Sequence, residues 1–207
     1  MMGNMTVAEL LCATAGTPGE IAINWMINQS YDERFKLLER SLDDCYRRLT
    51  DARQHNREDV VGEDQLSVQI VNMLQSAGIQ AEHDPQVGGH VDILVRGKNG
   101  FLWVGEAKIY RGPAYVKGGF LQLSTRYGIA QEGRDRGEIV IYCWQPRAWA
   151  ALEAWQAHLP QLEFPVKVVE ELGDGKLYFR TEHRCPATGI TFHVRHIIVP
   201  LFFEPLK

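Results

Sequence analysis

Residues 91–109, VDILVRGKNGFLWVGEAKI, decide the fold that this sequence predicts. Two apolar runs flank the tetrad GKNG at residues 97–100, where Gly and Asn accept positive φ at little cost. The stretch therefore predicts two antiparallel strands joined by a tight hairpin. Because side chains alternate between the faces of a strand, Glu106 and Lys108 share one face and Ala107 points to the other.

Asp92 lies at the start of the first strand of this hairpin, just after a Gly-Gly-His loop. Counting outward from the turn pairs Arg96 with Phe101 and brings Asp92 beside Gly105 and Glu106. Two carboxylates from neighbouring strands thus converge at one end of the hairpin. An unpaired charge at the end of an apolar strand is costly to bury, so such a cluster needs a partner or a chemical role.

The residue types in this cluster suit a hard divalent cation. Carboxylate oxygens from Asp92 and Glu106 are ligands that Mg²⁺ or Mn²⁺ prefers, and the carbonyl oxygen of Ala107 can add a further one. Such a cation lowers the pKa of a bound water and neutralises phosphoryl charge. Lys108 can orient or deprotonate that water, or stabilise the developing negative charge, and the sequence leaves these roles open.

Helices and strands alternate on either side of the hairpin. Residues 138–144, EIVIYCW, form a nearly continuous apolar run that is typical of a strand buried on both faces. The order predicts an α/β or α+β fold with a mixed central sheet flanked by helices. The other elements expected around the hairpin are a helix over 63–77, a short strand over 79–85, a helix over about 114–131 and a helix over 146–159.

The two ends of the chain add elements to a core expected over residues 59–160. Residues 1–20 are expected to be loosely ordered, and the apolar spacing over residues 21–54 predicts one helix. Residues 1–58 thus form an N-terminal helical extension, whose helix lies on its own domain or serves as a dimerisation arm. Residues 161–207 are expected to form a C-terminal β extension packed on the core.

The spacing of the acidic residues and the lysine resembles a known pattern. Asp92, thirteen intervening residues and then Glu106-Ala107-Lys108 on an apolar strand resemble the motif of the PD-(D/E)XK (restriction-endonuclease-like) nuclease superfamily. The resemblance implies a restriction-endonuclease-like core, in which a helix, three strands, a helix and a further strand follow one another. It also implies a glutamate near the metal on the first helix, and Glu63 matches by position.

The helix after the Glu-Ala-Lys strand carries a second element of the resemblance. Branches of the superfamily place a Gln and then a Tyr there, and Gln122 and Tyr127 resemble this pair. The spacing is one residue longer than in the family, so packing is the role expected for Tyr127. Asp84 is an alternative acid that lies farther from the hairpin. The implied catalytic residues are Asp92, Glu106, Lys108, Glu63 and Gln122, and the implied metal ligands are Asp92, Glu106, Ala107 and Glu63.

The function that the resemblance implies is Mg²⁺-dependent hydrolysis of phosphodiester bonds in DNA, with RNA as the less favoured substrate. The expected type is an endonuclease of restriction, phage defence or repair, and a homodimer would let two such sites cut two strands. Arg111, Lys117 and Arg126 are candidate contacts to the nucleic-acid backbone. Two alternatives stay open: a non-catalytic nucleic-acid- or protein-binding module on the same fold, and an interaction protein whose C-terminal strands bind a partner.

Composition narrows the class of function. The 207 residues are 45% hydrophobic and carry a formal net charge of −4, which excludes a histone-like basic coat but not a local basic patch. The four cysteines form no ligand pattern, so neither disulfides nor a zinc site are expected. The sequence predicts no secretory signal and no membrane span, and a cytoplasmic location is expected.

Aromatic and histidine side chains outside the cluster are expected to have structural roles. The tryptophans of the predicted strands and helices are expected in the core rather than in a base-stacking platform, and they are Trp103, Trp144, Trp149 and Trp155. The histidines of the C-terminal strands have no metal-binding spacing and are expected to be structural, and they are His183, His193 and His196.

Overall fold

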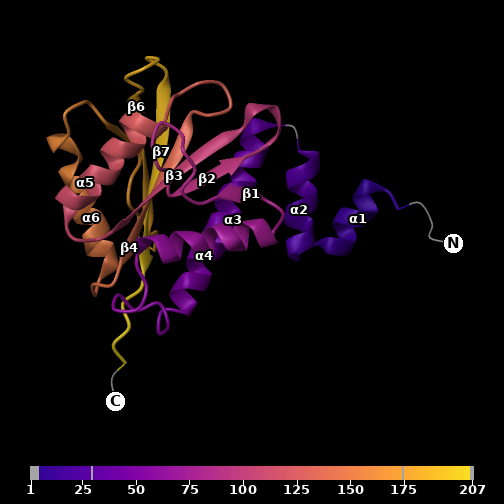
Figure 1. The fold of residues 1–207 in the computed structure, drawn as a ribbon, viewed down its shortest axis with the longest axis horizontal. Helices are drawn as coiled ribbons and strands as arrows, with labels where there is room; N and C mark the ends of the chain where they lie inside the picture. The colour runs from indigo at the N-terminus through magenta and orange to yellow at the C-terminus, as the bar shows by residue number, and fades with distance from the viewer. Residues whose placement is uncertain (1–4, 29, 174, 206–207) are drawn as a thin grey trace.

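The computed structural model describes residues 5–28, 30–173 and 175–205. Its centre is a seven-stranded mixed sheet with the order β1-β2-β3-β4-β7-β6-β5, flanked by helices as expected (Figure 1). The strands are β1 (Gln80–Glu82), β2 (Ile93–Arg96), β3 (Leu102–Ile109), β4 (Arg136–Cys143), β5 (Lys167–Glu170), β6 (Tyr178–Arg184) and β7 (Thr191–Pro200). The α-helices are α1 (Val7–Thr14), α2 (Pro18–Ile27), α3 (Tyr31–Asp51), α4 (Glu63–Ser76), α5 (Pro113–Gln122) and α6 (Ala148–His158). The short helical turns are η1 (Lys98–Gly100), η2 (Leu123–Tyr127) and η3 (Leu159–Gln161).

Two apolar cores hold the helices on the sheet. One face packs against α2, α3 and α4, with Leu38 and Leu66 fully buried. The opposite face packs against α5 and α6, with Phe120 and Trp155 fully buried. Because successive residues of a strand face opposite sides, the central strands contribute to both cores. The sheet is therefore covered on both faces, as the apolar run of β4 predicts.

The hairpin predicted around the GKNG tetrad is confirmed. Strands β2 and β3 are antiparallel, and Asn99 adopts the positive φ that the turn requires. The expected pairing of Arg96 with Phe101 is wrong by one residue, because Arg96 pairs with Leu102. The backbone N–H of Gly97 donates to the carbonyl of Phe101, so Phe101 closes the turn instead of beginning the ladder.

The middle of the chain follows the predicted order of elements. Residues 63–143 run helix, three strands, helix, strand. Strands β3 and β4 are parallel, and α5 lies in the connection between them. The helix expected over about 114–131 is shorter than predicted, because it ends at Gln122 and continues as η2, a π-helical turn that ends at Tyr127.

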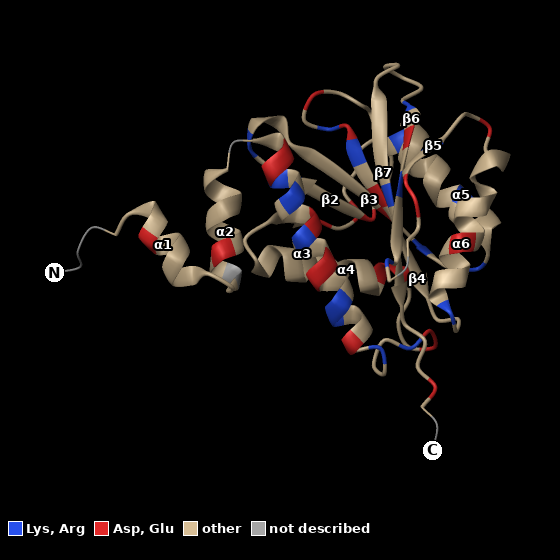
Figure 2. Ribbon diagram, turned by 180° about the vertical axis from the view of Figure 1, so that it is seen from behind, with Lys and Arg blue, Asp and Glu red and all other residues tan. Residues whose placement is uncertain are grey.

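The N-terminal part differs from the prediction in two ways. The single helix expected over residues 21–54 is two helices, since Ser30 caps a new helix by accepting a hydrogen bond from the N–H of Glu33. Residues 1–20 were expected to be loosely ordered, but residues 5–20 contain α1, which begins with a capping box between Thr6 and Glu9, and the first turn of α2. Residues 1–4 lie outside the described part of the chain. Helix α3 lies on its own sheet and exposes both acidic and basic residues (Figure 2).

The C-terminal strands extend the same sheet. Strand β7 pairs in parallel with β4 and antiparallel with β6, so it lies inside the sheet and not on top of it. The expectation that Trp149 is a core residue is wrong, because 38% of this residue is exposed, whereas Trp103 and Trp155 are buried. Within the described residues, no helix combines the length and the apolar character that a membrane crossing requires.

Candidate active site

Strand β3 extends beyond the end of β2, and two carboxylates accept hydrogen bonds from the edge of β3 that β2 no longer covers. The ladder between these strands stops at Ile93 and Gly105. Farther along β3, Asp92 Oδ2 accepts a hydrogen bond of 2.7 Å from the N–H of Ala107. Glu63 Oε2, at the first residue of α4, accepts one of 2.8 Å from the N–H of Ile109. The acids therefore occupy the positions along β3 where the next strand would have supplied carbonyl groups.

Lys108 joins these acids to Glu106. Its Nζ lies 2.6 Å from Glu106 Oε1, 2.8 Å from the carbonyl oxygen of Ala107 and 3.4 Å from Glu63 Oε1. Only 3% of the Glu106 side chain and 14% of the Lys108 side chain are exposed. The structure thus brings together four of the five predicted catalytic side chains: Asp92, Glu106, Lys108 and Glu63, which we call the acid cluster.

Three carboxylates share one ammonium group, and their pKa values reflect this imbalance. Burial raises the pKa of Glu106 to about 8, and the neighbouring Asp92 carboxylate contributes to this rise against the opposing effect of Lys108. Burial also raises the pKa of Asp92 and of Glu63. Burial alone would lower the pKa of Lys108, but Glu106, Glu63 and Asp92 raise it overall. The acid cluster therefore has a deficit of positive charge.

One buried oxygen of the acid cluster has no hydrogen-bond partner in the part of the chain that the structure describes. Glu106 Oε2 is buried and makes no hydrogen bond with any described residue. A buried carboxylate oxygen without a partner loses the hydration it had in water and gains nothing in return. Such an atom calls for a proton, a water or a cation.

Helix α5 closes over the acid cluster through Gly119, a residue outside the predicted site. A Cβ atom at Gly119 would lie 2.6 Å from Lys108 Cγ and 3.3 Å from Glu106 Cγ. The adjacent Gly118 has no atom within 4 Å of the same position. The Gly-Gly pair inside a predicted helix was the signal in the sequence, because glycine lowers helix stability and is therefore typical of positions where close packing leaves no room for a side chain.

The π-helical turn places Tyr127 near the acid cluster. The N–H of Gly128 donates to the carbonyl of Leu123, five residues earlier, so the turn absorbs one extra residue. Tyr127 is buried as expected for a packing residue, and its pKa is raised first by burial and then by Glu106 and Asp92. Within the described part of the chain, the half-buried Gln122 makes no hydrogen bond to the acid cluster.

Other residues of the region lie around the acid cluster rather than in it. The alternative acid Asp84 forms an exposed pair with His90, with 2.6 Å between Oδ1 and Nδ1. His83, which the sequence did not single out, instead contacts the cluster, because its Nδ1 lies 2.8 Å from the carbonyl oxygen of Asp92. Its position next to Asp84 in the sequence gave no signal of this contact.

The three residues predicted to contact the nucleic-acid backbone are basic and lie on segments that follow β3. Arg111 lies two residues after the end of β3, over the ring of Tyr115 and 5.9 Å from its centre. Lys117 on α5 forms an ion pair of 2.7 Å with Glu163, so its charge is already matched. Arg126 on η2 is exposed. Arg111 and Arg126 are therefore the better placed of the three to meet a phosphate.

The donor set of the acid cluster fits a hard divalent cation. Its carboxylate oxygens and the carbonyl oxygen of Ala107 are the atoms that Mg²⁺ and Mn²⁺ prefer, and Glu106 Oε2 has no competing partner among the described residues. No group of three or more His, Cys, Asp or Glu side chains is arranged to hold a metal ion as it stands, over the residues that the structure describes. The ammonium of Lys108 lies between Glu106 and Glu63, so a cation there would have to displace it.

Comparison with known proteins adds no family or function to this geometry. No family model, no curated protein and no solved structure matches the chain.

Proposed function

We propose that this chain is a metal-dependent nuclease of the PD-(D/E)XK kind, with a restriction-endonuclease-like core, that hydrolyses phosphodiester bonds of DNA. The observation that carries the proposal is the acid cluster itself. Asp92 and Glu106 lie beside each other at the β2–β3 end, and Lys108 follows Glu106 by two residues on the same face of β3. Glu63 joins them from 45 residues earlier in the chain. The motif resemblance favours DNA over RNA.

The metal ligands in this proposal are the carboxylates of Asp92, Glu106 and Glu63 and the carbonyl oxygen of Ala107. When bound, Mg²⁺ or Mn²⁺ would supply an activated water and neutralise charge on the phosphoryl oxygens. Glu106 has to lose its proton to bind a cation, because its pKa of about 8 keeps that proton on near neutral pH. Metal binding by this residue is therefore expected to strengthen as the pH rises toward 8.

The surroundings of Lys108 favour two of its three predicted roles. Its pKa is raised overall by three carboxylates, so the amine is held as an ammonium ion. An ammonium can donate hydrogen bonds to a phosphoryl oxygen or to the attacking water, but it cannot accept a proton. In the metal-free cluster, these surroundings therefore favour charge stabilisation and positioning of the water over general base catalysis as the role of Lys108.

The test is cleavage of supercoiled plasmid by the purified chain in Mg²⁺ or Mn²⁺, with EDTA as the negative control. We expect metal-dependent cleavage that Glu106→Gln and Lys108→Met each abolish. Lys36→Met is the matched control, since Lys36 forms an exposed ion pair with Glu33 on α3. Cleavage that survives both substitutions in the acid cluster would reject the proposed site.

A second function is favoured by the contacts that the carboxylates already make within the protein. Asp92 and Glu63 satisfy backbone N–H groups of β3, and Lys108 bridges Glu63 and Glu106. The same contacts could serve a non-catalytic binding module in which the acid cluster only secures the end of the strand. Absence of both Mn²⁺ binding and cleavage of any nucleic acid by a folded protein would select this function.

A further inference from the structure

Helix α1 is an apolar arm that the other described residues leave uncovered. Its sequence, VAELLCAT, has a single charged residue, Glu9, and none of its side chains is buried. Val7 is 54% exposed and Leu10 is 38% exposed. Figure 1 shows α1 projecting away from the sheet beyond α2. An isolated helix shorter than about 12 residues is marginal in water, so this eight-residue helix needs a surface to pack on.

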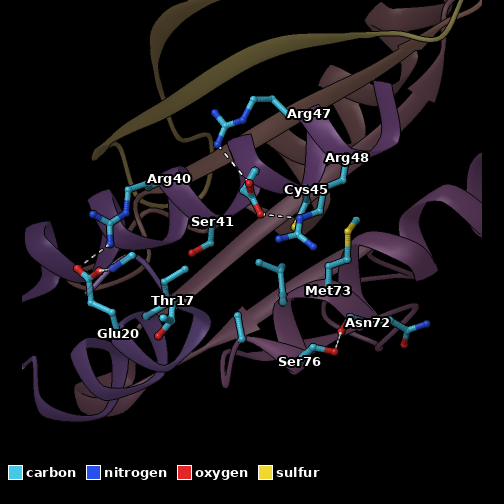
Figure 3. A pocket seen from close by; sticks show the side chains of 15 residues that line it. Thr17, Glu20, Arg40, Ser41, Cys45, Arg47, Arg48, Asn72, Met73 and Ser76 are labelled. Atoms are coloured by element: carbon cyan, nitrogen blue, oxygen red, sulfur yellow. Dashed lines mark hydrogen bonds and ion pairs between the residues drawn. The ribbon is translucent and has the colours of Figure 1, made fainter. Parts of the chain in front are cut away.

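A groove of about 550 Å³ opens between α2, α3 and α4 (Figure 3). Its apolar lining includes Ile21 from α2, Cys45 from α3 and Met73 and Leu74 from α4. Three arginines line it as well, with Asp44 and Glu20 as their ion-pair partners, and they are Arg40, Arg47 and Arg48. The charged residues of the groove thus sum to one net positive charge beside an apolar surface.

The arm and the groove meet at the turn between α1 and α2. Gly16 and Thr17, which lie in this turn, are themselves part of the groove lining. Glu20 and Ile21, in the first turn of α2, also line the groove, and no residue of α1 is in its lining. Figure 1 shows α1 on the side of α2 that faces away from α3 and α4. The chain's own arm therefore leaves the groove open in this conformation.

We propose that the groove binds α1 of a second copy of this chain, and that two copies exchange their arms in a symmetric dimer. One chain supplies both an uncovered apolar helix and an uncovered apolar groove, and a reciprocal exchange covers both at once. Exchange of identical elements closes the assembly at two copies and requires few new contacts. The charges agree, because Glu9 is the one charge on the arm and the groove is net positive. The acid cluster takes no part in the interface, so a test of the dimer and a test of the proposed function can fail independently of each other.

The first test is the mass of the protein in solution across a range of concentrations, by light scattering or sedimentation. We expect a dimer, and we expect Leu10→Glu to raise its dissociation constant at least about thirtyfold, since each copy loses one buried leucine. Val60→Glu is the matched control, because Val60 is 66% exposed and lies outside the arm and the groove. A wild-type protein that stays monomeric at every concentration would overturn the proposal.

A cross-linking test identifies the occupant of the groove without relying on folding of a charged variant. Cys12 on α1 is an exposed free cysteine, and Ser76 lies in the groove lining. A copy carrying Cys12→Ser and Ser76→Cys is mixed with the wild type and oxidised gently. We expect a covalent dimer that joins one copy of each kind, and none when Gln131→Cys, which lies outside the groove, replaces Ser76→Cys.

A third sample tells exchange apart from occupation of the groove by the chain's own arm. Ser76→Cys with native Cys12 retained is oxidised alone. Exchange predicts covalent dimers in this sample too. A monomer that has lost its accessible thiols would mean that the arm folds back onto its own groove, and this result would reject the exchange.

Discussion

Asp92 accepts a hydrogen bond from the backbone N–H of Ala107, at 2.7 Å, just beyond the point where β2 stops pairing with β3. This contact fixes the carboxylate beside Glu106 before any ligand arrives. It also gives Asp92 two separable contributions, one to the stability of the strand end and one to the charge of the acid cluster.

Substitutions of Asp92 should separate these contributions. Asp92→Asn keeps an oxygen that can accept from Ala107, so we expect it to remain folded while Mn²⁺ affinity and cleavage fall at least about tenfold. Asp92→Ala leaves the N–H of Ala107 without this partner and should cost about 1–3 kcal/mol of stability in addition. Urea denaturation and calorimetric titration of Mn²⁺ measure the two effects. Equal stability of both variants would show that the hydrogen bond contributes little.

Lys108→Met removes the cation that three carboxylates share. Without metal, we expect a loss of about 3–5 kcal/mol in the free energy of unfolding, because buried acids lose their partner. Mn²⁺ should restore this stability and bind more tightly than to the wild type, since no ammonium competes for Glu106 and Glu63, while cleavage remains absent. Thermal unfolding with and without Mn²⁺ checks this. Unchanged metal affinity would contradict a shared position for the ammonium and the ion.

Gly118 and Gly119 offer a matched pair on one helix. The methyl group of Gly119→Ala would lie 2.6 Å from Lys108 Cγ, so the lysine side chain has to shift and activity should fall at least about tenfold. Gly118→Ala meets no atom within 4 Å and should raise stability by up to about 1 kcal/mol, because alanine favours the helix. Melting temperatures and cleavage rates of the two variants test this contrast. Similar activity in both would mean that α5 does not constrain Lys108.

Two buried histidines predict a loss of stability in acid. Burial lowers the pKa of His196 to about 3 and that of His183 to about 4. The unfolded chain, with ordinary histidine pKa values near 6.5, takes up protons first as the pH falls, and stability is lost below about pH 6.5. Each histidine should cost about 2 kcal/mol between pH 6.5 and pH 5.

His183→Phe tests this pH dependence directly. Neither ring nitrogen of His183 has a hydrogen-bond partner among the described residues, and the side chain packs among aromatic rings, so phenylalanine should fit. We expect the variant to be at least as stable as the wild type at pH 7.5 and to lose less stability at pH 5. Urea denaturation at both pH values gives the comparison. A slope with pH identical to that of the wild type would assign the acid sensitivity to other groups.

The sequence is informative where the deciding contacts are local. The hairpin turn, the alternation along β3 and the position of Asp92 all follow from residues within 91–109, and the strands pair close to the predicted register. The one-residue error in pairing Arg96 arose at Phe101, whose carbonyl closes the turn. Local patterns do not show how many residues a turn uses when more than one closure is possible.

Local sequence patterns could not predict contacts between distant segments of the chain. The approach of α5 that selects Gly119 and the π-helical turn before Gly128 depend on how α5 packs against β3, not on periodicity. The insertion of β7 beside β4 pairs residues as distant in sequence as Arg136 and His193, and an apolar strand does not specify its neighbour. Local patterns also did not show the break between α2 and α3, because the apolar spacing continues through the residues where one helix ends and the next begins.

The place of β7 in the sheet has a consequence for synthesis of the protein. The edge of β4 that β7 covers carries unpaired backbone groups until residues 191–200 have left the ribosome. Strand β3, which carries most of the acid cluster, pairs with β4. The part of the sheet that is translated first therefore obtains its next strand only when β7 has been made. During that interval the nascent chain presents an open apolar strand to its surroundings, which makes slow translation or early release a route to aggregation.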